Sequence, residues 1–373
     1  MDGERPTSKA LQLAWQGTQR PADSIQKHDR CKIAAIGVGG TGCNIIAHLA
    51  KSGVKNTQTV AIGSNPLRLE ATQADHRILI SGKPHQGEGA SEHSVLDETA
   101  AAETLEQVKQ ILAKVDIVII TAGLGDETGT ETATIVAETA NRKGALTIGV
   151  VAKPLRSGRG RTRRSCQAIT KLRRNSDTLI TIDSNKLLET EPQLSIDEAS
   201  KIVDKMVAQT IRSLVEAISA SNLENPDIDD YKTILKQGGV ALVGIGESDA
   251  PNRAEEAVRN ALSSPLMHTD YTNATGALVH VSGDVKMTTE EASHVGEIVT
   301  KMMSSGAQVI WGAQVNPELN GRLRVTLLMT GTNPPQSPRR IGTLVPHLFN
   351  LETTWKPEKR LAVDLGLYQM EDY

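Results

Sequence analysis

A glycine-rich turn near residue 40 constrains the fold more than any other feature of the chain. The short apolar run 31–36 leads into Gly37-Val38-Gly39-Gly40-Thr41-Gly42 (the first glycine turn), and an apolar-periodic stretch follows from 44 to 50. This pattern predicts a strand, a tight turn and a helix. Glycines allow the backbone to come close to a phosphate at the N-terminus of such a helix. Taken alone, the turn leaves three interpretations open, which are a nucleotide site, an NAD site and a purely structural turn.

A second segment of similar composition favours the first of these interpretations. An NAD site needs a carboxylate at the end of the second strand, and the predicted strand 59–62 is followed by Gly63-Ser64-Asn65 instead. A buried strand at 115–121 leads into residues 122–131, AGLGDETGTE (the second glycine turn). Two such turns at the carboxyl ends of parallel strands can line one crevice. The sequence therefore predicts a nucleotide held from both sides.

The pattern of apolar runs predicts the fold class. Further strands at 145–151 and 178–182 alternate with helical stretches, which is typical of a doubly wound parallel α/β sheet. Ser195-Ile196-Asp197-Glu198 forms a capping box, and apolar residues recur at helical spacing as far as Ser219. We expect a central helix about 36 Å long, at 1.5 Å per residue, that supports two domains.

The rest of the chain predicts a smaller α+β domain and two flexible ends. β-rich runs at 240–245, 276–282, 307–311 and 323–331 alternate with helical stretches at 252–263 and 289–303. The predicted organisation is a flexible extension (1–30), a nucleotide-binding domain (31–194), the central helix (195–222), the α+β domain (223–332) and a flexible tail (333–373). The apolar-acidic stretch 361–368 of the tail is either a docking segment or a frayed end.

Composition excludes several classes of function. The 373 residues carry 41 basic and 44 acidic side chains, a balance of −3 that argues against a dedicated nucleic-acid binder. The three cysteines and nine histidines have no metal-binding spacing, so no dedicated metal site is expected. No apolar run reaches the roughly 20 residues that span a bilayer. We expect a cytoplasmic protein.

Several further motifs carry a family resemblance. Gly42 is followed two residues later by Asn44, Asn225-Pro226-Asp227-Ile228-Asp229-Asp230 has the form N-x-D-x-x-D, and Gly244-Ile245-Gly246-Glu247-Ser248-Asp249 begins a run that continues to Trp311-Gly312-Ala313. With the two glycine turns, these motifs resemble the FtsZ/tubulin superfamily, and its archaeal FtsZ branch most of all. The resemblance runs in order from about residue 31 to residue 332.

The resemblance implies a GTPase that polymerises head to tail, with each subunit completing the active site of its neighbour. GTP or GDP, with Mg²⁺, would be bound by residues of both turns and two later positions: Gly39, Gly40, Thr41, Gly42, Asn44, Gly125, Thr128, Gly129, Thr130, Arg161 and Asn185. The catalytic residues would be Asp227 and Asp230, which orient the attacking water, and Asn225, which positions the loop. The resemblance also implies action at the division site and a tail that docks a membrane-linking adaptor.

The nucleotide turns depart from the family pattern more than the rest of the chain. Asp126, Glu127 and Glu131 replace glycines of the family signature, Ser157 replaces a ribose-contacting glutamate, and Ser184-Asn185 replaces an Asn-Asp pair on the guanine side. The acids point into water, occupy the place of a phosphate at the start of a helix, or are bridged to a phosphate by Mg²⁺. Two hypotheses follow. The chain is a GTPase with altered loops, or it is a non-hydrolysing subunit that caps the nucleotide of an orthodox FtsZ partner.

A basic cluster lies between the second glycine turn and Ser184-Asn185. Residues 156–174 contain eight arginines and lysines and no acid. The cluster is a solvated helix face, a source of attraction for phosphate, or a contact with an anionic surface or nucleic acid.

Overall fold

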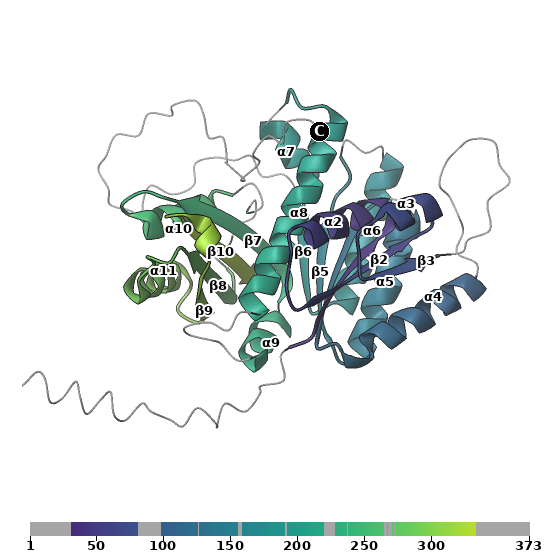
Figure 1. The fold of residues 1–373 in the computed structure, drawn as a ribbon, viewed down its shortest axis with the longest axis horizontal. Helices are drawn as coiled ribbons and strands as arrows, with labels where there is room; N and C mark the ends of the chain where they lie inside the picture. Colours follow the sequence, from purple (N-terminus) through teal and green to yellow (C-terminus); the bar gives the residue numbers. More distant parts are fainter. Residues whose placement is uncertain are drawn as a thin grey trace, which may run out of the picture. The chain divides into compact units, whose positions relative to one another are not determined.

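The computed structural model describes residues 31–80, 98–125, 127–155, 159–190, 192–219, 228–236, 238–264, 267, 271 and 273–332 (Figure 1). Strands and helices alternate up to residue 190, as the sequence predicts. In chain order they are β1 (Ile33–Val38), α2 (Gly39–Lys51), β2 (Thr57–Gly63), α3 (Pro66–Ala71), β3 (His76–Leu79), α4 (Glu98–Ile111), the 3-10 helix η2 (Leu112–Lys114), β4 (Ile117–Gly123), α5 (Glu127–Arg142), β5 (Leu146–Ala152), α6 (Arg159–Asn175), β6 (Thr178–Ile182) and α7 (Ser184–Thr190).

The first six strands form a parallel, doubly wound sheet, which confirms the predicted fold class. Their order is β3-β2-β1-β4-β5-β6, and every neighbouring pair is parallel. The winding direction reverses between β1 and β4, where Val38 is level with Ala122. In sheets of this kind, ligands bind outside the carboxyl ends of the strands at the reversal point. Both glycine turns leave the sheet at this point, so the topology places them side by side.

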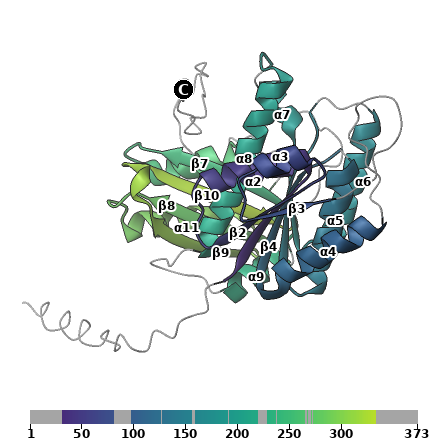
Figure 2. The same ribbon diagram turned by 45° about the vertical axis from the view of Figure 1, so that its right-hand side comes forward.

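Alternating side chains of the strands build a separate core on each face of this sheet. On one face Ile33 and Ala35 pack with residues of α2 and of the central helix α8 (Ile196–Ser219). On the other face Ile36 and Val38 pack with residues of α4, α5 and α6. Figures 1 and 2 show these two groups of helices on opposite sides of the sheet. The β-branched and alanine residues of the strands fit this packing because both faces are buried.

The central helix begins with the predicted capping box. The Ser195 hydroxyl accepts a hydrogen bond from the Glu198 amide (3.2 Å), and the Glu198 carboxylate accepts one from the Ser195 amide (3.0 Å). Such a cap stabilises a helix by about 1 kcal/mol. The apolar stripe of α8 packs on residues of both halves of the chain, including Ile148 of β5 and Leu328 of β10 (Leu323–Thr330). The expectation that one helix supports both halves is confirmed.

The C-terminal half is a four-stranded mixed sheet with helices on both sides. Its elements are α9 (Ile228–Lys236), β7 (Gly239–Ser248), α10 (Arg253–Leu262), β8 (Gly276–Gly283), α11 (Thr289–Met302), β9 (Gln308–Val315), η3 (Pro317–Leu319) and β10. The strand order continues from β6 as β7-β10-β8-β9. The helices α10 and α11 cover one face, whereas α8 and α9 pack on the other.

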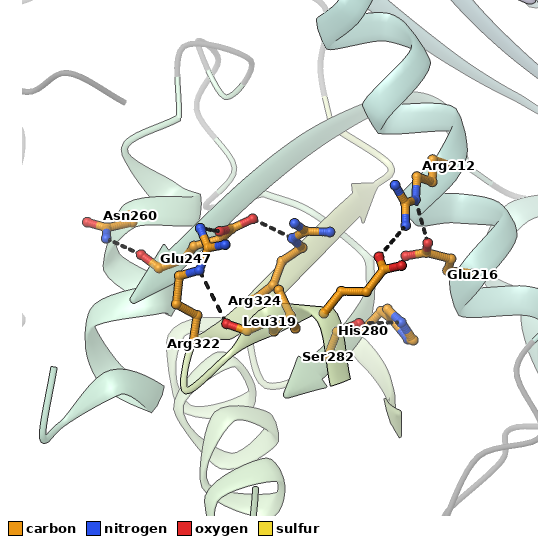
Figure 3. A network of polar contacts seen from close by, with 10 residues as sticks. Arg212, Glu216, Glu247, Asn260, His280, Ser282, Leu319, Arg322 and Arg324 are labelled. Atoms are coloured by element: carbon orange, nitrogen blue, oxygen red, sulfur yellow. Dashed lines mark hydrogen bonds and ion pairs between the residues drawn. The ribbon is translucent and has the colours of Figure 1, made fainter. Parts of the chain in front are cut away.

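Ion pairs add to this apolar contact between α8 and the C-terminal half (Figure 3). Arg212 of α8 bonds to Glu216 one turn later (2.6 Å) and lies 3.7 Å from Glu318 of η3. Further along the sheet, Glu247 of β7 accepts hydrogen bonds from Arg322 and from Arg324 of β10. The contact from Arg212 to Glu318 is long and Glu318 is exposed, so packing rather than this pair holds the two halves together.

The structure corrects the sequence analysis at both glycine turns. Helix α2 begins at Gly39, within the first glycine turn, rather than near Asn44. Helix α5 begins at Glu127 rather than near residue 132, so the second half of the second glycine turn, 127–131, already belongs to a helix. The short elements α3, β3, α7 and α9 were not predicted, and the basic cluster, for which several interpretations stayed open, lies largely in α6.

Several predictions lie outside the described residues. These include the extension 1–30, the tail 333–373, and the loop residues Asn225 and Asp227. The predicted boundaries between the parts of the chain therefore stay predictions. Among the helices that the structure does describe, none is long and apolar enough to cross a membrane.

Candidate functional site

The first glycine turn is closed by direct backbone contact. A β-carbon at Gly37 would lie 2.2 Å from the carbonyl oxygen of Gly42, and one at Gly42 would lie 2.8 Å from the carbonyl oxygen of Thr121 on β4. Real β-carbons do not approach oxygen so closely, so both positions require glycine. Gly39 has φ = +75°, which a glycine adopts without steric cost. The chain can therefore pass from β1 into α2 with no intervening loop residues.

The N-terminus of α2 has the features of an anion site. Its N-cap residue, Val38, makes no side-chain hydrogen bond to the first turn of the helix, and that first turn contains no acidic residue. The first amides of a helix carry a partial positive charge and lack partners within the helix. At Gly40 the space beside the backbone holds only the flexible end of the Arg68 side chain. The residues present therefore fit a bound phosphate.

The second glycine turn packs directly against the first. A β-carbon at Gly123 would lie 2.5 Å from Oγ1 of Thr41, so a glycine is needed where the two turns meet. Gly125 follows with φ = +118°, and its amide donates to Oγ1 of Thr130 (3.3 Å). Gly129 is buried in the same first turn of α5. The predicted residues of both turns thus share one edge of the sheet.

The same edge continues along β5 and β6 to two more predicted residues. A β-carbon at Gly125 would lie 3.2 Å from Cγ of Pro154 and 3.7 Å from Cβ of Arg161. Nδ2 of Asn185 donates to the carbonyl oxygen of Pro154 (3.3 Å). The structure therefore brings Arg161, in the first turn of α6, and Asn185, at the start of α7, to the rim that the glycine turns begin.

Asn185 is held by a half-buried ion pair, Lys153–Asp183, which no sequence motif indicated. Its backbone amide and its Nδ2 both donate to Oδ1 of Asp183 (3.1 and 3.2 Å), while Oδ2 of Asp183 accepts from Nζ of Lys153 (3.2 Å). Burial acts to raise the pKa of Asp183, but the Lys153 charge and the Asn185 hydrogen bonds outweigh it and hold that pKa below its usual value. The carboxylate is therefore ionised at neutral pH and fixes the direction of the Asn185 amide.

Asn44 lies at the end of a second link between elements. Its Nδ2 donates to Oδ2 of Asp204 on α8 (3.1 Å). Asp204 is only 6% exposed, and burial raises its pKa to about 6, although the Asn44 hydrogen bond and the Arg68 charge act to lower it. This carboxylate ties the helix of the first glycine turn to the central helix. Its position on the apolar stripe of α8, between Val203 and Val207, is the signal in the sequence that could have identified it.

Asp230, the one predicted catalytic residue within the described residues, lies at the other edge of the sheet. Its helix α9 is fixed by the Tyr231 hydroxyl, which donates to the carbonyl oxygen of Ala217 (2.7 Å). The carbonyl oxygen of Leu235 accepts from Thr178, the first residue of β6. A seven-residue strand such as β4 spans about 20 Å between its two ends. The structure therefore does not bring Asp230 to the glycine turns of its own chain.

Three further predicted residues are described only in part or not at all. Thr128 lies in the first turn of α5, at the edge that carries the other residues predicted to bind nucleotide. Asn225 and Asp227 precede α9 and lie outside the described residues. Within the part of the chain that the structure describes, no group of three or more histidine, cysteine or acidic side chains could hold a metal ion.

The fold and the paired glycine turns define a nucleotide-binding protein of the tubulin class. The sequence model of the tubulin/FtsZ family GTPase domain matches residues 32–191, and that of the FtsZ family C-terminal domain matches residues 239–333. Residues that match the first model carry both turns, and residues that match the second carry the mixed sheet. The helix α8 lies between the two matched segments.

Individual relatives agree with the domain matches. The chain is 36% identical over 342 residues to cell division protein FtsZ 2 of Methanocaldococcus jannaschii, covering 89% of each chain. It is 40% identical over 303 residues to FtsZ 1 of the same organism, covering 81% of this chain and 83% of that one. The structure superposes on an empty FtsZ dimer of M. jannaschii with a TM-score of 0.75, at 38% identity over 88% of this chain and 93% of that chain. The chain belongs to the FtsZ family.

A more distant likeness supports the fold alone. CetZ2 of Haloferax volcanii, solved as a protofilament with GTPγS bound, superposes with a TM-score of 0.64 at 20% identity over 82% of this chain and 94% of that chain. The conservation of the doubly wound sheet and the mixed sheet at this distance shows how little of the sequence the architecture requires.

Proposed function

We propose that this protein is an FtsZ-like cytoskeletal GTPase that polymerises head to tail in the cytoplasm at the division site and hydrolyses GTP at the contacts between subunits. One observation carries the proposal. The glycine turns lie at the carboxyl edge of the parallel sheet, whereas Asp230 lies at the opposite edge. An acidic loop that acts on the nucleotide must therefore come from a second copy. Membership of the FtsZ family, and the dimer solved for its M. jannaschii relative, support this arrangement.

The two glycine turns would bind the phosphates of GTP or GDP. The first amides of α2 and the amides around Gly125 would donate to phosphate oxygens, as they do at helix N-termini in general. Mg²⁺ would offset phosphate charge and would be held mainly by phosphate oxygens. Thr41 and Thr130 supply hydroxyl groups at the same edge, where they can donate to the bound polyphosphate, and Thr128 would join them.

The base would lie towards the start of α7. The Asn185 side chain is oriented by Asp183 and Pro154, which both accept from its Nδ2, and the base would be recognised by its amide group. A single amide oxygen accepts from guanine less completely than a carboxylate, which can accept from two N–H groups at once. Arg161, at the rim beside Gly125, is positioned for the ribose or the α-phosphate.

The catalytic group would come from the neighbouring subunit. Asp230 lies in the first turn of α9 and is exposed, and the sequence places Asp227 three residues before it. Two carboxylates at this spacing can orient a water molecule and accept its proton as the bond to the γ-phosphate breaks. Asn225 would position the loop that carries them.

A mixing experiment tests the shared site. Asp230→Ala retains the nucleotide turns but lacks the catalytic carboxylate. Gly40→Asp retains Asp230 but places a carboxylate at the N-terminus of α2, where it competes with phosphate. Each variant alone should hydrolyse GTP at well under a tenth of the wild-type rate per subunit. An equimolar mixture should regain turnover, because a contact between unlike subunits can contain both intact halves.

The wild-type protein provides the reference in the same assay. Its turnover per subunit should rise with protein concentration, since the active site forms only on association. If the mixture stays as inactive as either variant while both still associate with wild-type protein, the shared site is disproved. GTP binding by the Asp230→Ala variant must be confirmed by calorimetry, so that its inactivity reports catalysis alone.

A second candidate function follows from the acids at the start of α5. Glu131 is exposed in its first turn, and Asp126 and Glu127 immediately precede or begin the helix. If these acids take the place of a phosphate, the chain is a non-hydrolysing subunit that caps the nucleotide of an orthodox FtsZ partner through Asp230. It would then raise the GTP turnover of that partner without any turnover of its own. Asp230→Ala should abolish the increase, and an undiminished increase would exclude this role.

A further inference from the structure

Arg68 occupies a position beside the first glycine turn that none of the motifs includes. It lies on the short helix α3, which Asn65 caps by accepting from the Arg68 amide (3.1 Å). The next residue, Leu69, is buried against Cys43 of α2 and Ala61 of β2. These contacts fix α3 against the helix that begins at the glycine turn. The Arg68 side chain reaches back over that turn, where Nη1 lies 2.5 Å from the place of a β-carbon on Gly40.

The guanidinium has donors to spare at this position. Arg68 is exposed, and its guanidinium makes no hydrogen bond or ion pair with any residue in the described ranges. A guanidinium carries five N–H donors in a planar fork that matches the oxygens of phosphate. In contrast, Arg77 on the neighbouring strand β3 donates from Nε to the carbonyl oxygen of Thr72 (2.7 Å). Arg68 therefore has a fixed location and unused hydrogen-bonding capacity.

The Arg68 guanidinium and the N-terminus of α2 place two positive charges close together. The N-terminus of α2 carries the positive end of the helix dipole and has no acidic residue in its first turn to offset it. A guanidinium placed over the same turn adds a second positive charge. The buried Asp204 carboxylate, whose pKa the Arg68 charge acts to lower, offsets part of this positive charge, and an anion between the guanidinium and the first amides of the helix would offset more of it.

We propose that Arg68 binds the polyphosphate of the nucleotide, as a cationic group that acts together with the amides of the first glycine turn. The proposal rests on the proposed function, because it adds a residue to that site. It also explains how the site tolerates its acids. The second glycine turn gains negative charge at Asp126, Glu127 and Glu131, and Arg68 brings a positive charge to the first turn. The ligand class is a nucleoside di- or triphosphate, read through its phosphates and not through its base.

Gly40 provides an independent way to move the guanidinium. The backbone of Gly40 lies outside the left-handed region, and a β-carbon there would meet only the far end of the Arg68 side chain. Gly40→Ala is thus compatible with helix α2 and should displace the guanidinium without altering the turn. Alanine is also the better helix former.

The test compares phosphate-bearing and phosphate-free ligands by equilibrium binding. GTP, GDP and guanosine are titrated into nucleotide-free wild type, Arg68→Gln, Arg68→Lys and the control Arg142→Gln. Arg142 is exposed at the C-terminus of α5. Its replacement by glutamine removes the same charge at the opposite edge of the sheet. We expect Arg68→Gln to weaken GTP binding about tenfold, as for a lost charge-assisted hydrogen bond. Guanosine binding should not change, Arg68→Lys should lie between, and Arg142→Gln should match wild type.

Combination with Gly40→Ala decides whether the two residues act together. If alanine acts by displacing Arg68, the double variant should bind GTP no more weakly than Arg68→Gln alone. Additive losses would show that the methyl group blocks the phosphate by itself. Equal GTP affinity of Arg68→Gln and wild type, or an equal loss for guanosine, overturns the assignment of Arg68 and leaves the nucleotide site intact. A wild-type protein that binds neither GTP nor GDP overturns the proposed function, and the assignment with it.

Discussion

The two glycine turns share one edge of the sheet but are built on different physical grounds. In the first, glycines are required because backbone atoms touch, as between Gly37 and the carbonyl oxygen of Gly42. In the second, Gly125 is required by its φ of +118°, and the turn is closed by a hydrogen bond to the side chain of Thr130. The conformation of the first turn is thus set by backbone packing within the core of the sheet, which leaves no room for side chains at Gly37 and Gly42. The second depends on local dihedral angles and side chains, and can tolerate more change.

The acids that replace family glycines lie in the second turn and not in the first. The first turn of α2 has no acid, whereas α5 begins with Glu127 and carries Glu131 one turn later. A side chain added at Gly37 or Gly42 would collide with the backbone, so those positions cannot vary. Residues at the start of α5 can change without loss of the fold, since acids there also stabilise the positive end of a helix. The difference between the turns therefore predicts different responses to substitution.

Gly37→Ala should have the largest effect on stability. Its β-carbon would lie 2.2 Å from the Gly42 oxygen and 2.4 Å from Cγ1 of Ile46, both inside the packed core. We expect a loss of about 3 kcal/mol or more in the free energy of unfolding, at the upper end for overpacked positions. Urea denaturation without nucleotide measures it. Gly40→Ala is the matched control in the same turn and should unfold within about 0.5 kcal/mol of wild type. Equal losses at both positions would remove the steric distinction.

Gly125→Ala should have an intermediate effect that includes function. An alanine at φ = +118° carries strain of about 1–3 kcal/mol, and its β-carbon would press on Pro154 at 3.2 Å. The turn can relieve this strain by rotating, which would break the hydrogen bond to Thr130. We expect both lower stability and weaker GTP binding. Gly144→Ala is the control, because Gly144 has φ = +80° with no atom within 4 Å, and lies at the opposite edge. It should lose stability without losing GTP affinity.

The sequence predicted the first turn better than the second for the same reason. Steric requirements appear directly as glycines at fixed spacing, and the strand, the turn and the sheet topology followed from them. The extent of α5 did not follow, because threonine and glycine in Thr128–Thr130 are weak helix formers and the helix is set by packing on the sheet. The short elements α3 and β3 were missed because six and four residues carry too little periodicity.

The predicted nucleotide residues came from motifs, and their role stays a prediction, whereas the contacts that orient them depend on three-dimensional proximity alone. Both turns, Arg161 and Asn185 came from motifs, and the structure places them along one edge. The Lys153–Asp183 pair joins residues 30 positions apart, and the Asn44–Asp204 bond joins residues 160 apart. No local pattern records such pairings. The sequence does contain one signal for Asp204, because it is a single carboxylate on the apolar stripe of α8.

Asp204→Asn should raise the free energy of unfolding at neutral pH, by less than Gly37→Ala lowers it. The native pKa of Asp204 is raised from 3.8 to about 6, so the native state holds its proton more tightly than the unfolded state. Stability from this group is therefore full below about pH 4 and falls as pH rises towards 6. Asparagine stays neutral and keeps an oxygen to accept from Asn44. The variant should match wild type near pH 4 and exceed it by roughly 1–3 kcal/mol at pH 7.

The pH profile must be read as a difference between variant and wild type. His280, buried in the C-terminal half, has its pKa lowered to about 4 by burial and by the Arg324 charge. It contributes the opposite slope, because stability is lost as pH falls below the usual histidine pKa. Subtracting the two urea-denaturation profiles cancels His280 and isolates Asp204. A difference that does not vary with pH would show that the Asp204 carboxylate is not desolvated, and that the link from the first turn to α8 is solvated.

Glu131→Gln should have the smallest effect, and it bears most directly on the acids of the second turn. Glu131 is exposed, so solvent and salt screen its charge from a bound phosphate. We expect GTP affinity to rise by less than about threefold at low salt and the gain to vanish at high salt, in line with the small energies of exposed charge pairs. Glu138→Gln, near the C-terminal end of α5, is the matched control and should leave GTP affinity unchanged. A rise of tenfold or more would mean that Glu131 lies against the phosphate, so that the second turn opposes the ligand which the first turn binds.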